Sequence, residues 1–244
     1  MLKILYVVGT GSAHDDAELK WSLRSLNRFS LTEVEPVVVG RVPEWFAGES
    51  LPCDDPFNRK EKNILRKIVY AASKGLVNGE FQISADDHFW LRPVDLSPLP
   101  VYWRQGILPE YRDGNNYEKA LDGTRRVLLE NGYPAINTTV HCNQWVHTDD
   151  FADVYRLLDS AEAVPFAKEY GLVNWAVFPN VGIVKRRRPI RFKHDVKLGD
   201  VSAEDLKAVT DSSLIMSIND DAFKSEAFVK YMETEFSGKS RWER

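Results

Sequence analysis

Two adjacent aspartates and a histidine, Asp86-Asp87-His88, stand in the segment FQISADDHFWL between a short apolar run and an aromatic one. Adjacent carboxylates repel each other unless a cation lies beside them. A hard divalent cation such as Mg²⁺ or Mn²⁺ prefers carboxylate oxygens and often bridges to the phosphates of a substrate. The pair is therefore a candidate metal site, and the alternative is a pair of solvated acids in a turn.

A second acidic pair, Asp220-Asp221, follows an apolar segment that ends at Ile218. One of these acids could cap the last helix, or it could complete a metal site that begins at Asp87. His141 could remove a proton from a hydroxyl nucleophile near neutral pH if it lies beside that metal. A packed or surface histidine is the alternative for His141.

The segment GTGS at residues 9–12 joins an apolar run to a predicted helix. Its glycines would let the backbone approach a ligand closely, and the N-terminus of a helix attracts anions. The segment is neither a P-loop, because no Gly-Lys-Ser/Thr follows, nor a complete GxGxxG fingerprint. Two interpretations stay open: contact with the base or ribose of a nucleotide, or a tight turn alone.

Two groups of basic and polar residues could contact a phosphate. Asn63, Arg66 and Lys67 share a predicted helix just before the acidic segment, and an exposed helix face is the alternative. Residues 185–193, KRRRPIRFK, form the strongest basic cluster of the chain. The cluster could clamp a diphosphate or contact a polyanionic acceptor, or it could be a solvated strand face.

The elements that position these residues follow one another in the order of an α/β fold. Residues 2–40 predict a βαβ unit, with strands at 2–8 and 36–40 and a helix that Asp15 caps between them. A helix over 61–73 and a strand over 81–85 come next. Because ligands bind outside the carboxyl ends of strands in open α/β sheets, the acids after residue 85 are well placed to bind one.

The second half of the chain has weaker periodicity. It predicts a short helix near 117–130, a helix after the cap at 148–150, one or two strands within 181–198, a strand over 212–218 and a last helix over 222–236. No internal repeat or linker divides the sequence. We expect a single compact domain, with residues 1–100 as a nucleotide-binding half and residues 101–244 as an acceptor-side half.

Composition limits the class of protein. A net charge of −4 over 244 residues argues against a surface that coats nucleic acid. The two cysteines, Cys53 and Cys142, form no CxxC motif, which fits a reducing compartment. No apolar run is long enough for a signal peptide or a membrane span. We expect a soluble, cytoplasmic protein.

Four segments, in order, resemble the sequence blocks of GT-A-fold glycosyltransferases related to the Stealth proteins. The segments are KILYVVGTGSAHDDAELKWSLRSL, FQISADDHFWLRPVD, TTVHCNQWVHTDDFADVY and MSINDDAFKSEAFVKYMETEFSGKSRWE. The same order of blocks occurs in small glycosyltransferase-like proteins of phages and bacteria. The resemblance implies a GT-A-like (Rossmann-type) α/β fold, with a mixed, mostly parallel sheet flanked by helices.

The resemblance also implies an activity and roles for single residues. It implies a metal-dependent glycosyltransferase that moves a sugar from a nucleotide-sugar, UDP-linked, to a hydroxyl acceptor. Asp87 and Asp220 would bind Mn²⁺ or Mg²⁺, and the catalytic residues would be Asp86, which holds the ribose or the geometry of the site, and His141, which deprotonates the acceptor. The residues expected at the nucleotide, directly or in support, are Thr10, Gly11, Ser12, Arg24, Asn63 and Arg66.

Other interpretations of the same residues stay open. The Stealth proteins themselves transfer a sugar 1-phosphate, although this chain is short and lacks their tryptophan signature, which favours glycosyl transfer. A metal-dependent phosphodiesterase or nuclease would need more ligands at short spacing than the five scattered histidines provide. A binding module without catalysis is the remaining class. The acceptor could be a glycan or a hydroxymethylated base in phage DNA.

Overall fold

A five-stranded sheet forms the centre of the protein. The computed structural model describes residues 1–10, 14–104, 106–111, 113–192 and 196–244. The sheet has the strand order β3-β2-β1-β4-β7. The strands are β1 (Leu2–Val8), β2 (Val34–Gly40), β3 (Ser50–Pro52), β4 (Glu80–Ser84) and β7 (Gln144–His147). The first four run parallel, and β7 pairs antiparallel to β4 at one edge.

The apolar residues of β1 explain why this strand lies in the middle of the sheet. Ile4, Leu5 and Tyr6 are almost completely buried, as expected for a strand covered on both faces. Side chains alternate between the two faces of a strand. Leu5 accordingly packs in one core cluster with α2 (Lys60–Ser73), and Ile4 and Tyr6 pack in another with α1 (Ala17–Phe29).

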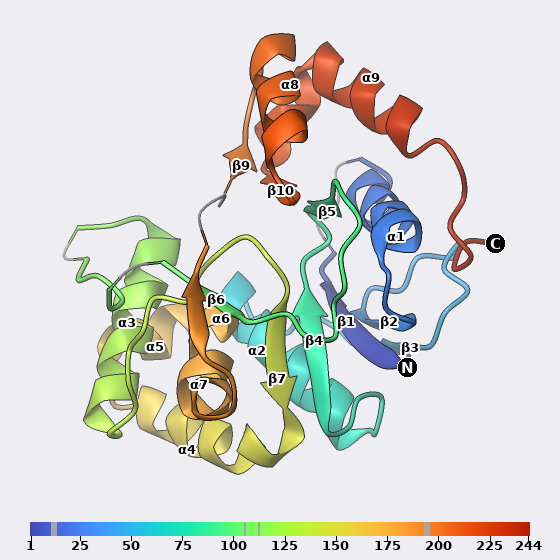
Figure 1. Cartoon of the computed structure of the whole chain (residues 1–244). Coiled ribbons are helices and arrows are strands. Elements are labelled where there is room, and N and C mark those ends of the chain that lie inside the picture. The colour runs from blue at the N-terminus through green and yellow to red at the C-terminus, as the bar shows by residue number, and fades with distance from the viewer. Residues whose placement is uncertain (11–13, 105, 112, 193–195) are drawn as a thin grey trace.

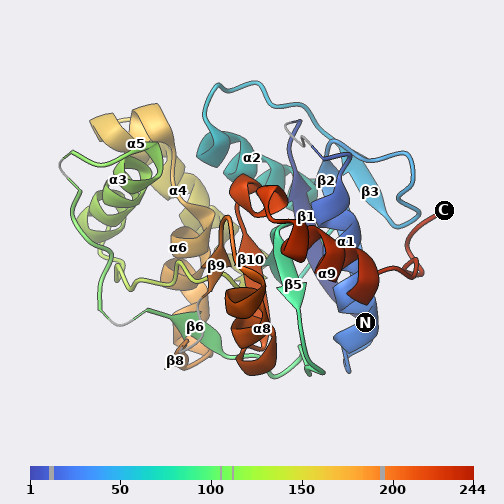
Figure 2. The same ribbon diagram turned by 90° about the horizontal axis from the view of Figure 1, so that it is seen from above.

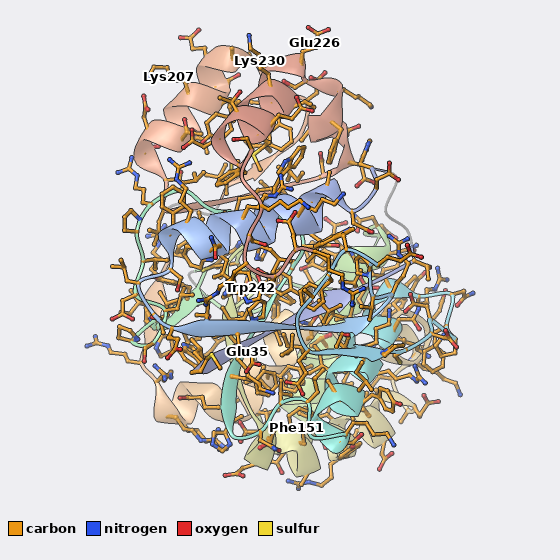
Figure 3. The ribbon with its side chains drawn as sticks, turned by 90° about the vertical axis from the view of Figure 1, so that its right-hand side faces the viewer. Glu35, Phe151, Lys207, Glu226, Lys230 and Trp242 are labelled. Carbon is orange, nitrogen blue, oxygen red and sulfur yellow. The ribbon has the colours of Figure 1, made fainter. Side chains whose placement is uncertain are left out.

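The two faces of the sheet carry unequal layers (Figure 1). One face is covered by α2 together with α3 (Asn116–Glu130), α4 (Phe151–Ala161), α5 (Pro165–Tyr170) and α6 (Asn174–Phe178). The other face is covered by α1. A third layer lies on the outer side of α1, so that the molecule shows helices, sheet, α1 and the third layer in sequence (Figure 3).

The third layer is built around a small sheet of strand order β5-β10-β9. Its elements are β5 (His88–Trp90), β9 (Lys197–Leu198), α8 (Ala203–Ser212), β10 (Ile215–Ile218) and α9 (Glu226–Glu235). Trp21 of α1 packs with Phe89 and Phe228 in the core of this layer, which places α9 beside α1 (Figure 2). Residues more than a hundred positions apart thereby meet above the central sheet.

Short elements complete the chain. They are β6 (Val101–Trp103), which pairs with β8 (Pro189–Arg191), two 3-10 helices (Thr148–Asp150 and Asp220–Lys224), a π-helical turn (Pro179–Ile183) and α7 (Val184–Arg186). No helix in the described part of the chain combines the length and the apolar character that crossing a membrane requires.

The sequence predicted the fold class and most elements of the first half, and the mixed, mostly parallel sheet flanked by helices is confirmed. Three details were wrong. Asp16, not Asp15, stands at the N-cap of α1, in a left-handed conformation (φ 58°) and without a side-chain cap. Two strands do lie within 181–198, as predicted, namely β8 and β9, but the helical turns at 179–186 were missed, and β3, β6, β7, α5, α6 and α8 were not predicted.

The C-terminal segment is fastened to α1 by an ion pair. Arg24 Nη2 lies 2.6 Å from Glu243 Oε2, Arg24 Nε donates to Oε1 at 2.9 Å, and Arg24 Nη1 donates to the carbonyl of Phe236 at 2.9 Å. The Glu243 side chain is only 4% exposed. Burial alone would raise the pKa of Glu243, but hydrogen bonds from Arg24 and Ser240 outweigh it and lower this pKa.

We predict that Glu243→Gln lowers the free energy of unfolding at pH 7 by about 1–3 kcal/mol, because it removes the charge from a buried, two-point hydrogen bond. The folded-state pKa lies below the unfolded value, so the pair stabilises the fold above about pH 4.3 and loses this effect as pH falls through the folded pKa. Urea unfolding measures the difference, which should shrink below that pH. Glu233→Gln, at an exposed position of α9, is the matched control. Equal unfolding midpoints for Glu243→Gln and wild type at pH 7 would contradict the prediction.

Candidate functional site

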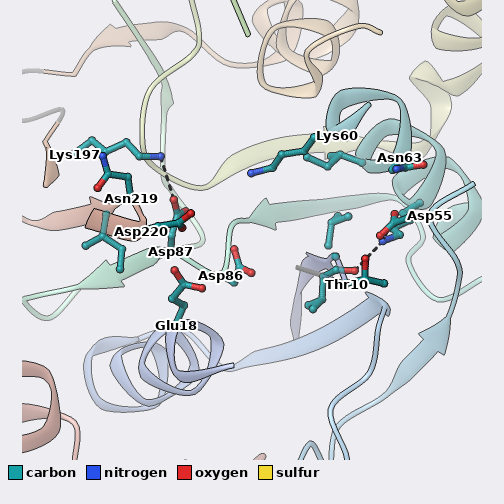
Figure 4. A pocket seen from close by; sticks show the side chains of 16 residues that line it. Thr10, Glu18, Asp55, Lys60, Asn63, Asp86, Asp87, Lys197, Asn219 and Asp220 are labelled. Carbon is teal, nitrogen blue, oxygen red and sulfur yellow. Dashed lines mark hydrogen bonds and ion pairs between the residues drawn. The ribbon is translucent and has the colours of Figure 1, made fainter. Parts of the chain in front are cut away.

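A cavity of about 520 Å³ opens at the carboxyl ends of β1, β4 and β10. Thr10 follows β1, Asp86 and Asp87 follow β4, and Asp220 follows β10. Glu18 enters from the first turn of α1 (Figure 4). The cavity therefore lies where open α/β sheets bind ligands.

The small sheet of the third layer brings Asp220 to Asp87. β10 pairs antiparallel with β5, and the backbone N–H of Ile218 donates to the carbonyl of Asp87 at 3.3 Å. Asn219 accepts from the N–H of Asp221 and so caps the 3-10 helix that begins at Asp220. The predicted meeting of Asp87 and Asp220 at one cavity is thus seen in the structure, and the cap is Asn219 instead of either aspartate.

The carboxylates repel each other strongly. Burial, followed by the charge of Asp87, raises the pKa of Asp86 to about 6. Burial, followed by the charges of Asp86, Asp87 and Asp220, raises the pKa of Glu18 to about 7. The acids therefore share one space, and the protein's own cations only partly compensate their charge.

Two lysines face this acidic group. Lys197 Nζ lies 3.2 Å from Asp87 Oδ2, and Lys60 extends toward the acids from the opposite side (Figure 4). Burial alone would raise the pKa of Asp87, but His88, Lys197 and Lys60 together lower it. These cations could bind the oxygens of a phosphate as well as they balance the acids.

The residues fit a divalent cation that arrives with a phosphate. Within the described residues, no three His, Cys, Asp or Glu side chains are grouped closely enough to form a metal cage on their own. Mg²⁺ at nucleotide sites is usually held by one or two carboxylates, with water and substrate phosphates as the other ligands. Asp87 and Asp220 can supply that number, and the mutual repulsion of the acids favours a bound cation.

The floor of the cavity is a buried ion pair. Lys67 Nζ lies 2.6 Å from Asp55 Oδ1 and donates to the carbonyl of Val8 at 2.8 Å, with its side chain 2% exposed. Gly40 lies against this pair with φ 116°, and a Cβ there would lie 2.0 Å from the Val8 carbonyl oxygen. Lys67 therefore holds the end of β1 to the loop that carries Asp55.

A second cavity, of about 480 Å³, adjoins the first along Asp86 and Asp87, which line both. His141 lines the second cavity, and its ring centre lies 6.5 Å from that of His88. The Trp175 ring lies 5.9 Å from His88 on another side. His141 is thus near the acidic group but in the neighbouring cavity.

The structure places the residues expected at the nucleotide in different locations. Thr10 and Asn63 line the first cavity, and Asn63 uses its amide to bind both backbone groups of Phe57, at 3.1 and 2.7 Å. Gly11 and Ser12 lie outside the described residues.

The two arginines expected to support the site line neither of the two cavities. Arg24 is occupied by Glu243, as described above. Arg66 is exposed and donates to the carbonyl of Asp54 at 3.0 Å. Both side chains hold other segments of the chain, and neither is placed to contact a ligand in the first cavity directly.

The basic cluster at 185–193 also lies elsewhere. Arg186 forms two hydrogen bonds with Asp150, at 2.5 and 2.7 Å. Arg187 pairs with Glu80 at 2.8 Å and lies over the ring of Trp145, 4.0 Å from its centre. None of the described residues of the cluster lines either cavity, and Lys193 lies outside the described residues. The described residues of the cluster therefore do not face the first cavity, whereas Lys60 and Lys197 do.

Several residues that line the cavities were not predicted from the sequence. Lys60 and Lys197 lie outside the basic cluster at 185–193. Trp175 lies in a short helix that was not predicted. Glu18 is an acid in the first turn of α1, a common position that does not by itself indicate a site. Lys67 was grouped with Asn63 on a predicted helix, so it is the one of these residues that the sequence indicated.

Comparison with known proteins supports the fold. No protein-family model matches the chain, and a search of curated proteins found no significant match. The crystal structure of a glycosyltransferase involved in glycosylation of the major capsid of PBCV-1 is 11% identical over 97% of this chain and 99% of that chain, with a TM-score of 0.43. An active-site mutant of LgtC is 9% identical over 97% of this chain and 95% of that chain, with a TM-score of 0.50. The likeness to LgtC shows that the chain shares its mixed α/β fold.

Proposed function

We propose that the protein is a glycosyltransferase that moves a sugar from a nucleotide-sugar, UDP-linked, to a hydroxyl acceptor. The observation that carries the proposal is the pair of adjoining cavities that share Asp86 and Asp87 at the carboxyl edge of the sheet. A transfer between two substrates needs two such compartments that meet at the reacting atoms. The fold shared with LgtC is consistent with this activity.

The first cavity is the compartment for the donor. The departing nucleoside diphosphate gains negative charge, and Lys60 and Lys197 face the space where that charge would develop. Asp87 and Asp220 would hold Mn²⁺ or Mg²⁺, which when bound supplies Lewis-acid neutralisation of the diphosphate. Thr10, at the end of β1, would contact the nucleotide.

The second cavity is the compartment for the acceptor. His141 would accept the proton of the attacking hydroxyl, a role that suits an imidazole near neutral pH. Asp86 borders both compartments and would orient the ribose or the reacting sugar between them. The two compartments do not coincide with the expected nucleotide-binding half (1–100) and acceptor-side half (101–244) of the chain. Lys197 and Asp220, from the second half, complete the donor compartment.

We predict that Asp87→Asn and Asp220→Asn each lower Mn²⁺-dependent hydrolysis of the donor at least about 100-fold, because each removes charge that binds the cation. The assay screens UDP-, GDP- and ADP-linked sugars and quantifies the nucleotide released. Asp221→Asn is the matched control, since Asp221 is exposed, pairs with Lys224 and lines neither cavity.

The products separate the proposed function from its rivals. Release of a nucleoside diphosphate supports glycosyl transfer, and release of a nucleoside monophosphate would instead indicate a Stealth-like transfer of sugar 1-phosphate. Near wild-type turnover by Asp87→Asn would refute the metal role. A thermal shift with UDP and Mn²⁺ in wild type but not in Asp87→Asn would support it independently of turnover.

We predict that His141→Ala lowers the rate of transfer to an acceptor by about 10²–10⁴-fold, the usual contribution of a general base. Binding of UDP and Mn²⁺, followed by thermal shift, should persist because His141 does not line the first cavity. His147→Ala, at a histidine of β7 outside both cavities, is the control. An unchanged transfer rate in His141→Ala would exclude this histidine as the base.

A further inference from the structure

Part of the lining of the second cavity is chemically unlike the first cavity. It is formed by Tyr117, Thr139, Val140, Val173, Asn174 and Trp175. Among the described residues, Glu61 is the only Asp, Glu, Lys or Arg that lines this cavity and not the first. Binding sites for small uncharged ligands are typically lined in this way, by apolar and aromatic side chains with a few placed polar groups.

Asn174 supplies a polar group without a partner. It is the first residue of α6 and only 4% exposed, and its Nδ2 has no hydrogen-bond partner among the described residues. A buried amide donor that stays unpaired destabilises a protein, so native structures almost always satisfy it. A ligand oxygen in the cavity that Asn174 lines would satisfy this donor.

Trp175 supplies a rigid aromatic surface beside that donor. Its indole Nε1 donates to the carbonyl of Cys142 at 3.1 Å, and its own carbonyl accepts from Thr138 Oγ1 at 2.7 Å. The orientation of the ring is therefore fixed before any ligand binds. A pyranose has one face of C–H bonds that packs well on such a ring, whereas its hydroxyls need hydrogen-bond partners at the edge.

The charges of this cavity disfavour a polyanion. The acids Glu61, Asp86 and Asp87 line it, and one of its two lysines, Lys197, is paired with Asp87. Arg186 and Arg187, which could have contacted the phosphates of DNA, are paired with Asp150 and Glu80 outside it. A nucleic acid would need cations along its backbone at this rim.

We propose that the second cavity binds an uncharged saccharide as the acceptor, with a sugar ring against Trp175 and Asn174 Nδ2 donating to one of its oxygens. This inference rests on the proposed function. In the reaction, an acceptor hydroxyl oxygen forms a bond to the anomeric carbon and its proton passes to His141. The bond from that carbon to the diphosphate oxygen breaks, and the nucleoside diphosphate leaves with the electron pair.

The test uses the full chain with Mn²⁺ and the nucleotide-sugar that it hydrolyses fastest. Acceptor probes are p-nitrophenyl glucosides, galactosides and mannosides, with an oligonucleotide that carries 5-hydroxymethylcytosine as the competing class. We expect at least one glycoside to stimulate diphosphate release saturably and to yield a glycosylated product by mass. Asn174→Ala should raise the KM for that glycoside about 3- to 10-fold and lower the ratio of transfer to hydrolysis.

Two further variants keep the test decisive. Tyr117→Ala removes a half-exposed ring from the same part of the lining and should raise the acceptor KM at least about 3-fold, even if Asn174→Ala fails to fold. Asn27→Ala, at an exposed position of α1, is the control and should leave this KM within about twofold of wild type.

The outcomes separate this inference from the proposed function. Hydrolysis that no glycoside stimulates, stimulation by the oligonucleotide alone, or an acceptor KM unchanged in both Tyr117→Ala and Asn174→Ala would overturn the saccharide acceptor and leave the proposed function standing. Absence of Mn²⁺-dependent hydrolysis with every nucleotide-sugar would overturn both.

Discussion

The repulsion among four carboxylates is the constraint around which the structure is arranged. Asp86, Asp87, Asp220 and Glu18 come from three layers of the fold and meet at one cavity. Burial, together with the charges of the other three acids, raises the pKa of Glu18 to about 7. A fold keeps such groups together only where the surrounding packing is strong enough to oppose the repulsion, which is typical of functional sites.

That packing comes from the layer beyond α1. Pairing of β10 with β5 fixes Ile218 against Asp87, and the apolar contacts of Trp21, Phe89 and Phe228 hold this layer on the helix. The pair of Arg24 with Glu243 then fastens the segment that follows α9 to the same helix. α1 is therefore both a cover for the central sheet and the base on which the second acidic segment is mounted.

The elements that the sequence predicted are those whose pattern is local. The apolar run of β1 and the helical periodicity of α2 need only neighbouring residues to be recognised. β7 has four residues, and it is a strand because β4 offers it an edge, with Val146 opposite Phe81. No local pattern contains that information.

The same distinction explains which site residues were foreseen. Asp86, Asp87 and Asp220 follow apolar strands, so their place at the carboxyl ends of strands could be inferred from the sequence alone. Arg24 was misassigned because its partner, Glu243, is 219 positions away. The role of the cluster at 185–193 stayed open for a similar reason, since Arg186 and Arg187 pair with Asp150 and Glu80 on other elements. Charge in a sequence indicates where a cation is, and only the fold decides which anion it meets.

The different chemistry of the two cavities bears on how a transferase suppresses hydrolysis. Water competes with the acceptor for the activated sugar, so the compartment next to the reacting carbon should hold an acceptor well and bulk water poorly. The second cavity has Val140, Val173 and Trp175 in its lining, which would exclude water from that part of the space. In the proposed reaction the first cavity would instead neutralise a diphosphate, and it is lined by acids and lysines. Asp86 and Asp87 stand at the boundary, where a charged leaving group and a neutral nucleophile have to meet.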